Sequence, residues 1–262
     1  MWYKILSSFL FASTLFSSCV LRSSSTSLTK YQQAMQCYVT QKYHEASGLF
    51  KEALPLLQGK AEEASAHFYQ AYCHFYQKKY VQSSEAFKYF HETFLGDPRI
   101  EEALYMQGHA LYLGSPSVKR DQTLTREAVS ILRDYRHRYP QGVYSDKALA
   151  QLGYLHDKLA LKAFNNARLY HQLKHYRAAV VTLENLQKDF PTSPYSEKAA
   201  YLKADAQCRY IKETEGDEQK EQLAIATKYC QVFLARYSDS AYASSVKTLY
   251  KNLSAVAQSK KR

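Results

Sequence analysis

The chain has 262 residues, of which 46% are hydrophobic and 14% aromatic, and its formal charge is +11 at pH 7. This length is enough for one or two domains with a sizeable core. The positive charge favours negatively charged partners, such as anionic lipid head groups, nucleic acid or acidic protein surfaces. After residue 18, no apolar run approaches the roughly twenty residues that a membrane-spanning helix needs, which excludes an internal membrane anchor.

Residues 1–18 have the pattern of a lipoprotein signal peptide. Lys4 precedes an apolar stretch from Ile5 to Phe16, and two serines then lead into Cys19. Small residues directly before a cysteine resemble the lipobox of bacterial lipoproteins, in which the cysteine is acylated. We therefore expect Cys19 to be the lipid attachment site and residues 19–28 to form a Ser-rich tether, with an ordinary cleaved signal as the alternative. Export of the chain argues against nucleic acid as a partner.

Repeated segments follow the tether. The segments "RYPQGVYSDKA" from Arg138, "DFPTSPYSEKA" from Asp189 and "RYSDSAYASSV" from Arg236 each combine an aromatic residue, a turn and the start of a helix. Before each turn, a small residue is followed by further apolar residues four and seven positions later. Ala128, Leu132 and Tyr135 are one such set, and their spacing places them on one helical face.

These helix pairs resemble tetratricopeptide (TPR) repeats. We therefore predict an all-α fold, a right-handed superhelix of about five TPR-like antiparallel helix pairs over residues 29–253. The N-terminal repeats occupy about residues 29–140 and the C-terminal repeats about 141–253, before a basic tail over residues 254–262. Stacked repeats of this kind form extended inner surfaces that bind other molecules.

Motifs of known catalytic sites do not occur in the sequence. It has no Gly-x-Ser-x-Gly, no phosphate-binding glycine loop, no His-Glu-x-x-His and no Cys-x-x-Cys. His171 and His175 have the spacing of metal ligands on one helical face, but no carboxylate or thiol completes a site, so we interpret both as surface histidines. We predict that the protein is not an enzyme and needs no cofactor or metal.

Two segments carry a closer resemblance. Residues 121–144 and 157–195 are similar to the third and fourth repeats of the outer-membrane protein assembly factor BamD family. The third repeat contains an insertion: Gly108 to Ala128 is 20 residues, whereas Ala71 to Ser83 is 12. The resemblance covers the anchor and nearly all of residues 28–253.

The resemblance implies a lipid-anchored outer-membrane protein that faces the periplasm. It would be a scaffold of the β-barrel assembly complex, binding a BamA-like β-barrel protein through its POTRA domains and also unfolded segments of outer-membrane proteins. A TPR lipoprotein or periplasmic adaptor for cell-wall synthesis or division is the alternative, and an enzyme or carbohydrate-binding lipoprotein on helical repeats is a third class.

Candidate site residues follow from the same resemblance. Cations and aromatic residues of the C-terminal repeats would bind the partner, unless they are simply solvated helix surface: Lys174, Tyr176, Arg177, Lys188, Arg209 and Lys212. Tyrosines of the N-terminal repeats would line the groove for unfolded segments: Tyr69, Tyr72 and Tyr76. The alternative for these tyrosines is helix core. The expected packed stripe is Ala64, Phe68, Ala71, Tyr72 and Phe75, which leaves Tyr69 and Tyr76 free.

Four further cysteines fall within the helical repeats, where cysteine commonly serves as a small buried residue: Cys37, Cys73, Cys208 and Cys230. Only Cys208 and Cys230, on the two helices of the fifth repeat, are candidates for a disulfide.

Overall fold

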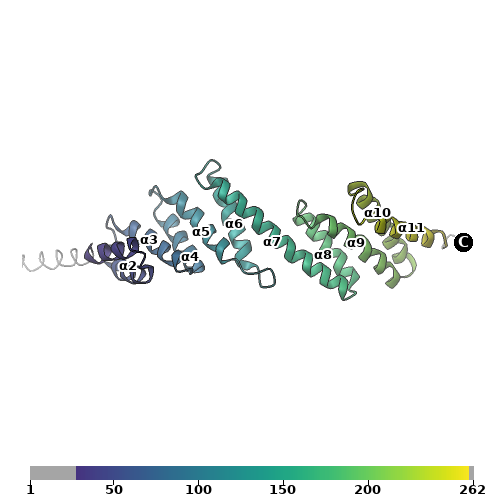
Figure 1. Ribbon diagram of the computed structural model, residues 1–262, viewed down its shortest axis with the longest axis horizontal. Coiled ribbons are helices and arrows are strands. Elements are labelled where there is room, and N and C mark those ends of the chain that lie inside the picture. Colours follow the sequence, from purple (N-terminus) through teal and green to yellow (C-terminus); the bar gives the residue numbers. More distant parts are fainter. Residues whose placement is uncertain (1–27, 260–262) are drawn as a thin grey trace, which may run out of the picture. The chain divides into compact units, whose positions relative to one another are not determined.

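The computed structural model describes residues 28–259, and the regular structure in this range is helical (Figure 1). A helical segment over residues 28–39 comes first. The elements that follow are α2 (Tyr43–Leu57), α3 (Glu63–Tyr76), α4 (Tyr80–Thr93), α5 (Ile100–Gly114), α6 (Thr123–Arg138), α7 (Ser145–Gln172), α8 (Tyr176–Asp189), α9 (Ser196–Tyr210), the 3-10 turn η1 (Ile211–Glu213), α10 (Gly216–Arg236) and α11 (Ala243–Ser259). The predicted all-α fold is confirmed. Residues 1–18 and Cys19 lie outside the described range.

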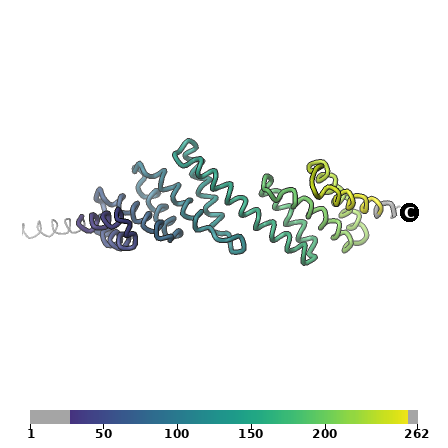
Figure 2. Tube along the Cα trace, in the orientation of Figure 1, coloured from purple at the N-terminus to yellow at the C-terminus, as the bar shows by residue number. Residues whose placement is uncertain are grey.

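The chain divides into two compact units. The N-terminal unit extends to Pro116 and includes Gln122–Leu152, whereas the C-terminal unit contains Ser117–Asp121 and the chain from Gly153 onward. In the N-terminal unit, α2 packs against α3, α3 against α4, α4 against α5, and α5 against α6. In the C-terminal unit, α8 packs against α9, α9 against α10, and α10 against α11. Figure 2 traces these successive helical hairpins. The boundary falls within α7, and not at the turn near residue 140.

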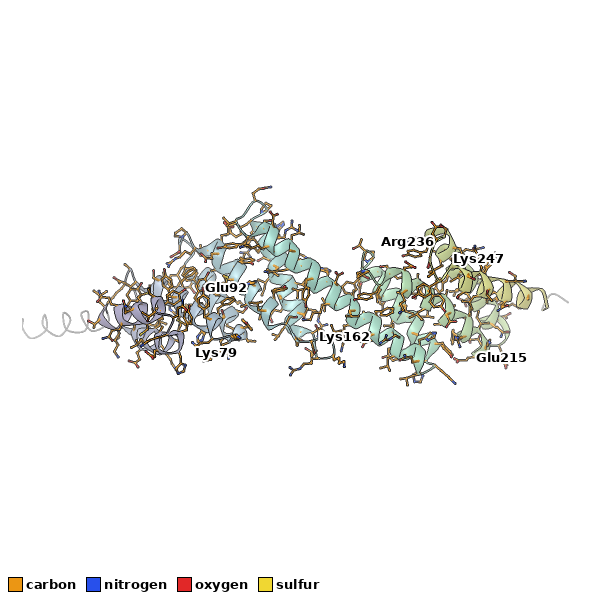
Figure 3. The ribbon with its side chains drawn as sticks, in the orientation of Figure 1. Lys79, Glu92, Lys162, Glu215, Arg236 and Lys247 are labelled. Carbon is orange, nitrogen blue, oxygen red and sulfur yellow. The ribbon has the colours of Figure 1, made fainter. Side chains whose placement is uncertain are left out.

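The predicted helical stripe forms the core. The small residues that begin it are fully buried, including Ala46, Ala128 and Ala179, and so are residues four positions later such as Phe50, Leu132 and Leu183. Gly108 lies at a close approach of two helices, because a Cβ atom there would be 2.9 Å from the Cδ2 atom of Leu132. Charged side chains occupy the outer surface, as Glu92 and Lys247 do in Figure 3.

Three turns between paired helices share one backbone conformation. Gln41, Lys78 and Lys174 have φ angles of 61°, 60° and 63°, the left-handed region that favours glycine. In each turn the next residue donates a backbone hydrogen bond to a carbonyl of the preceding helix, as His175 does to Tyr170 at 2.9 Å. This bond satisfies a carbonyl at the helix end, and a tyrosine then begins the following helix.

The inserted segment of the third repeat is a loop between α5 and α6. Hydrogen bonds join the two ends of this loop. The hydroxyls of Ser115 and Thr125 are 2.7 Å apart, and Thr125 donates to Oε1 of Gln122 at 2.8 Å. At the other end of the chain, α11 continues to Ser259, beyond the predicted end of the repeats at Leu253. Among residues 28–259, no helix combines the length and the apolar character needed to span a membrane.

Candidate binding surfaces

Five of the six residues predicted to bind a partner gather at one end of α8. Lys174 occupies the turn before α8, and Tyr176 and Arg177 begin that helix. Arg209 lies in the last turn of α9 and Lys212 in η1. The sixth residue, Lys188, is exposed in the last turn of α8 and lies away from this group.

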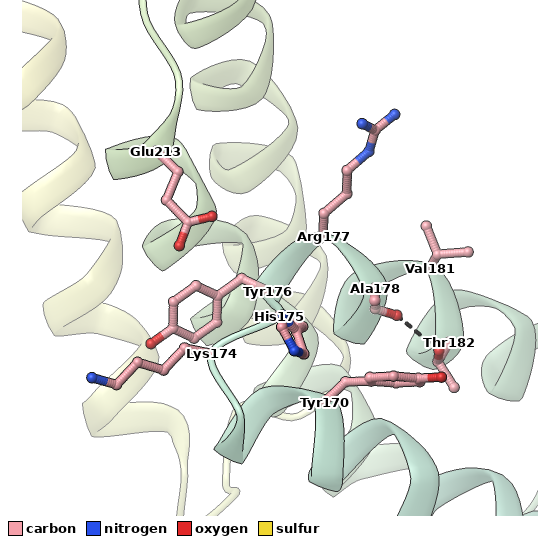
Figure 4. A pocket seen from close by; sticks show the side chains of 9 residues that line it. All are labelled: Tyr170, Lys174, His175, Tyr176, Arg177, Ala178, Val181, Thr182 and Glu213. Atoms are coloured by element: carbon pink, nitrogen blue, oxygen red, sulfur yellow. Dashed lines mark hydrogen bonds between the residues drawn. The ribbon is translucent and has the colours of Figure 1, made fainter.

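A shallow cavity of about 590 Å³ lies beside this turn (Figure 4). Lys174, Tyr176 and Arg177 line it, together with Tyr170 of α7 and Glu213 of η1. In the view of Figure 4, the Arg177 side chain extends away from the two tyrosine rings. The cavity therefore combines aromatic surface with both signs of charge.

A buried carboxylate fixes the aromatic and cationic groups next to this cavity. Asp205 is only 7% exposed, and its Oδ2 atom lies 2.6 Å from Nε2 of His171 and accepts a bond from Nε of Arg209 at 2.8 Å. The guanidinium of Arg209 is 5.9 Å from the centre of the Tyr176 ring, close enough for a cation-π contact. The hydrogen bond to Asp205 raises the pKa of Arg209, which therefore stays charged.

Both histidines were interpreted as surface residues, but only His175 is exposed. His175 is exposed and lines the first cavity, as a surface histidine would. His171 is half-buried between Asp205 and the ring of Tyr176, which it meets edge-on at 5.8 Å, so its interpretation as a surface histidine was wrong. Its carboxylate partner is 34 residues away in the chain, so local spacing carries no signal for the contact.

A second cavity, of about 400 Å³, lies beside the end of α9 and η1. Arg209 and Lys212 line it together with the side chain of Cys208 and an apolar wall. That wall consists of Ile211, Leu223, Leu249 and Leu253. Both cavities are thus edged by predicted partner-binding cations.

Exposed apolar residues near the first cavity were missed at the sequence level. Leu169 is 52% exposed, Leu173 56% and Val181 50%, and Val181 lines the cavity. Leu169 lies in the last turn of α7, and Leu173 follows that helix directly and donates its backbone N–H to the Leu169 carbonyl at 2.9 Å. An apolar centre surrounded by charged groups is typical of protein interfaces. Apolar residues off the stripe were the signal that could have identified this surface.

The tyrosines predicted to line a groove belong to one aromatic cluster of the N-terminal unit. Tyr76 is 46% exposed, and its ring stacks on Tyr43 of α2 at 4.5 Å and on Tyr72 at 5.9 Å. Tyr69 packs against Tyr38 at 4.9 Å. These rings come from the segment 28–39, α2 and α3. The tyrosines therefore support one another and also present ring surface to solvent.

Hydroxyl groups in this cluster are held as hydrogen-bond donors. The hydroxyl of Tyr72 donates to the carboxylate of Glu102. Burial, followed by this hydrogen bond, raises the pKa of Tyr72, and burial likewise raises the pKa of Tyr38. Both groups therefore stay protonated at neutral pH.

The packed stripe of α3 was predicted only in part. Phe68 and Ala71 are buried, as expected. Ala64, Tyr72 and Phe75 are half-buried, whereas Ala66 and Cys73 complete the buried set. The rings of Tyr72 and Phe75 also contact rings outside the buried set, Tyr76 for Tyr72 and His109 for Phe75.

Further rings extend the cluster along the N-terminal unit. Phe75 contacts His109 at 5.6 Å, His109 stacks on Tyr105 at 5.4 Å, and Tyr105 stacks on Tyr144 at 4.4 Å. Gln151 donates a hydrogen bond to the Tyr105 hydroxyl at 3.0 Å. Sequence reasoning missed this extension, because its members lie on three different helices and in a turn.

Metal ligands do not cluster in the part of the chain that the structure describes. Within residues 28–259, no three His, Cys, Asp or Glu side chains lie close enough to hold a metal ion.

Residues 24–209 match the family model YfiO, described as "Outer membrane lipoprotein". Three relatives carry the name "Outer membrane protein assembly factor BamD". The relative from Rickettsia prowazekii is 23% identical over 224 residues, which is 86% of this chain and 85% of that protein. The relative from Haemophilus influenzae is 23% identical over 61% of this chain and 67% of its own length. The relative from Caulobacter vibrioides is 24% identical over 52% of this chain, but the match spans only 44% of its length.

Among solved structures, the TPR domain of P58(IPK) is similar over 88% of this chain and 56% of that chain, with a TM-score of 0.42 and 14% sequence identity.

Proposed function

Because this chain belongs to the YfiO family of outer membrane lipoproteins and is related to the assembly factor BamD, we propose that it is a non-catalytic scaffold that helps insert β-barrel proteins into the outer membrane. In this proposal, acyl chains on Cys19 attach it to the outer membrane and residues 19–28 tether the repeats on the periplasmic side. The helical units then bind other proteins.

The C-terminal unit is the proposed binding site for a BamA-like β-barrel protein, through the POTRA domains of that partner. The observation that carries this proposal is the network around Asp205, which holds Tyr176 and Arg209 in place between two cavities. A surface fixed before binding loses less conformational entropy when the partner arrives. Its cations favour an acidic partner surface, and the exposed Val181 and Leu173 favour an apolar contact at its centre.

The N-terminal unit is the proposed site for unfolded segments of outer-membrane proteins. Tyr69, Tyr72 and Tyr76 lie in a cluster of packed rings, and the hydroxyl of Tyr72 stays protonated. Tyrosine offers a flat apolar body with a polar tip, and this combination suits extended chains of varied sequence.

An affinity purification from crosslinked cells tests the scaffold and its partner together. The protein carries a C-terminal tag, and wild type is compared with Arg177→Glu and with Lys51→Glu. Arg177 lines the first cavity, whereas Lys51 is an exposed lysine on α2 and serves as the matched charge-reversal control. We expect a β-barrel protein with POTRA domains to co-purify with wild type and Lys51→Glu, and to be reduced at least tenfold with Arg177→Glu.

One outcome would contradict the scaffold itself, and another would contradict only the position of its partner site. Recovery of cell-wall synthesis or division proteins without the barrel protein would favour the periplasmic adaptor. Equal recovery of the barrel protein with both variants would keep the scaffold but move its partner site away from the first cavity.

A further inference from the structure

Two cysteines of the C-terminal unit lie in one core cluster on two helices that pack against each other. Cys230 of α10 belongs to this cluster, together with Ala204 and Phe233, and Cys208 of α9 packs against it. Both cysteines are free thiols, and the pKa of each is shifted by the other. Two free thiols in one cluster, on neighbouring helices, are placed to form a disulfide.

The two thiols differ in access from solvent. Cys208 is half-buried and lines the cavity of about 400 Å³, whereas Cys230 is completely buried. A small solute in the cavity can therefore meet the sulfur of Cys208 but not that of Cys230. This is the arrangement of one attacking and one resolving cysteine.

The interaction between the two thiols also affects reactivity. It lowers the pKa of Cys230 and raises the pKa of Cys208, which burial raises as well. When one proton leaves the pair, the remaining thiol therefore stabilises the thiolate, which is the reactive form. Cys73 has no such partner, and burial raises its pKa to about 12.

We propose that Cys208 and Cys230 are a reactive pair that forms an intrachain disulfide by exchange with a small organic disulfide entering the cavity. Cys208 gives its proton to the thiolate of Cys230 while its sulfur attacks one sulfur of the small disulfide, and the first small thiolate leaves. The sulfur of Cys230 then loses its proton and attacks Cys208, releasing the second small thiolate. The two released thiolates take up the two protons, so one disulfide is reduced while one is formed.

The bond would link the end of α9 to the middle of α10. Arg209 and Lys212 follow Cys208 directly in the chain and line the same cavity. Oxidation would therefore hold these two cations more firmly, whatever molecule binds to them. The inference concerns the thiols themselves and does not depend on the proposed function.

Peptide mass spectrometry tests the proposal on the folded, full-length protein. The reduced protein is treated with glutathione disulfide, quenched in acid, alkylated and digested with trypsin. Cys208 lies in the tryptic peptide 204–209 and Cys230 in the peptide 229–236. We expect these two peptides to be linked, with a mass two hydrogen atoms below their sum, while Cys37 and Cys73 remain separate. The oxidised protein should also unfold at a higher urea concentration than the reduced protein.

Single variants distinguish the two roles. In Cys230→Ser, Cys208 should stop at the mixed disulfide with glutathione, whereas in Cys208→Ser, Cys230 should stay unmodified until the protein is unfolded. Circular dichroism checks the fold of each variant, and Cys230→Ala replaces the serine variant if that one does not fold. The proposal is overturned if, in folded wild type, Cys208 and Cys230 remain unlinked after treatment, or if each carries its own glutathione.

Discussion

Tyr43 in the N-terminal unit and Tyr176 in the C-terminal unit occupy the same place in the repeat, but their neighbours differ. Each tyrosine begins a helix after a turn whose φ angle is positive, at Gln41 or at Lys174. Each tyrosine contacts, edge-on at 5.8 Å, the ring of the residue five positions earlier in the chain. This residue is Tyr38 in the N-terminal unit and His171 in the C-terminal unit. The backbone geometry is therefore repeated, while the chemistry changes.

The helix that follows each tyrosine, α3 in the N-terminal unit and α9 in the C-terminal unit, also differs in chemistry. Asp205 and Arg209 repeat the spacing of Tyr72 and Tyr76 relative to these tyrosines. In the N-terminal unit the two residues are stacked rings, 5.9 Å apart, whereas in the C-terminal unit they form an ion pair at 2.8 Å. One set of repeat positions thus carries an aromatic cluster in one unit and a charged surface in the other, and the proposed function assigns extended chains to the first and a folded partner to the second.

The largest expected effect comes from removing the carboxylate of Asp205 from the C-terminal set, which consists of His171, Tyr176, Asp205 and Arg209. The equivalent N-terminal set is Tyr38, Tyr43, Tyr72 and Tyr76. Asp205→Ala leaves His171 and Arg209 without their common acceptor, so we expect the free energy of unfolding to fall by about 3 kcal/mol. The matched change, Tyr72→Phe, keeps the ring stack and loses one hydroxyl, for a loss of about 1 kcal/mol. Urea denaturation measures both. Equal losses would show that the two sets are stabilised in the same way.

Loss of an exposed ring should damage the N-terminal set. Tyr76→Ala removes the two stacked ring contacts, with Tyr43 and Tyr72, and aromatic pairs contribute about 1 kcal/mol each, so we expect a loss of about 2 kcal/mol in stability. Affinity for an unfolded outer-membrane protein segment, measured by fluorescence anisotropy, should fall about tenfold, which corresponds to about 1.4 kcal/mol. Tyr76→Phe keeps the ring and is the control. Unchanged affinity with Tyr76→Ala would place the segment elsewhere.

Replacing one residue by its equivalent from the other set tests the proposed partner site with a smaller loss of stability. Arg209→Tyr gives the C-terminal set the residue that the N-terminal set has at Tyr76. We expect the affinity for the barrel partner to fall about tenfold, equivalent to about 1.4 kcal/mol, because a cation next to Tyr176 is lost. Stability should change by less than 1 kcal/mol, since Arg209 is half exposed. Isothermal titration calorimetry and urea denaturation separate the two effects, and retained affinity would contradict a role for this cation.

The turns offer a smaller and opposite effect. Lys78→Gly and Lys174→Gly each replace a residue at positive φ by the one that adopts it freely, so each should stabilise its unit by about 0.5–1 kcal/mol. Only Lys174→Gly should also weaken partner binding, because Lys174 lines the first cavity. Partner binding that falls equally with both glycines would trace the effect to the backbone and not to the lysine.

The smallest expected effect is a loss of stability of the N-terminal unit at acid pH. The hydrogen bond from Arg99 lowers the pKa of Asp97, with the two side chains 2.6 Å apart. Because the pKa is lower in the folded state, this contribution is present above the unfolded pKa of about 4 and is lost as the pH falls below it. Asp97→Asn should remove this part of the pH dependence, measured by hydrogen exchange at α3 and α4. An unchanged pH profile would contradict a contribution from the pair.

The sequence predicts the helices and their core well, because spacings of four and seven residues report directly which face is buried. Ala128, Leu132 and Tyr135 are buried as that pattern requires. The six candidate partner residues come only from the family resemblance, and their role in binding stays a prediction. The sequence misses the contact between His171 and Asp205 and the row from Tyr105 to Tyr144, because these join separate helices and leave no mark in local spacing.

Photocrosslinking at equivalent sites of the two units tests the central claim most directly. A photoreactive phenylalanine analogue replaces either Tyr76 or Tyr176 in cells, and the products are identified by mass spectrometry. We predict that position 176 captures a β-barrel protein with POTRA domains and that position 76 captures unfolded outer-membrane protein segments. If both positions capture the same molecule, or if the two products are exchanged, the assignment of separate roles to the two units is wrong.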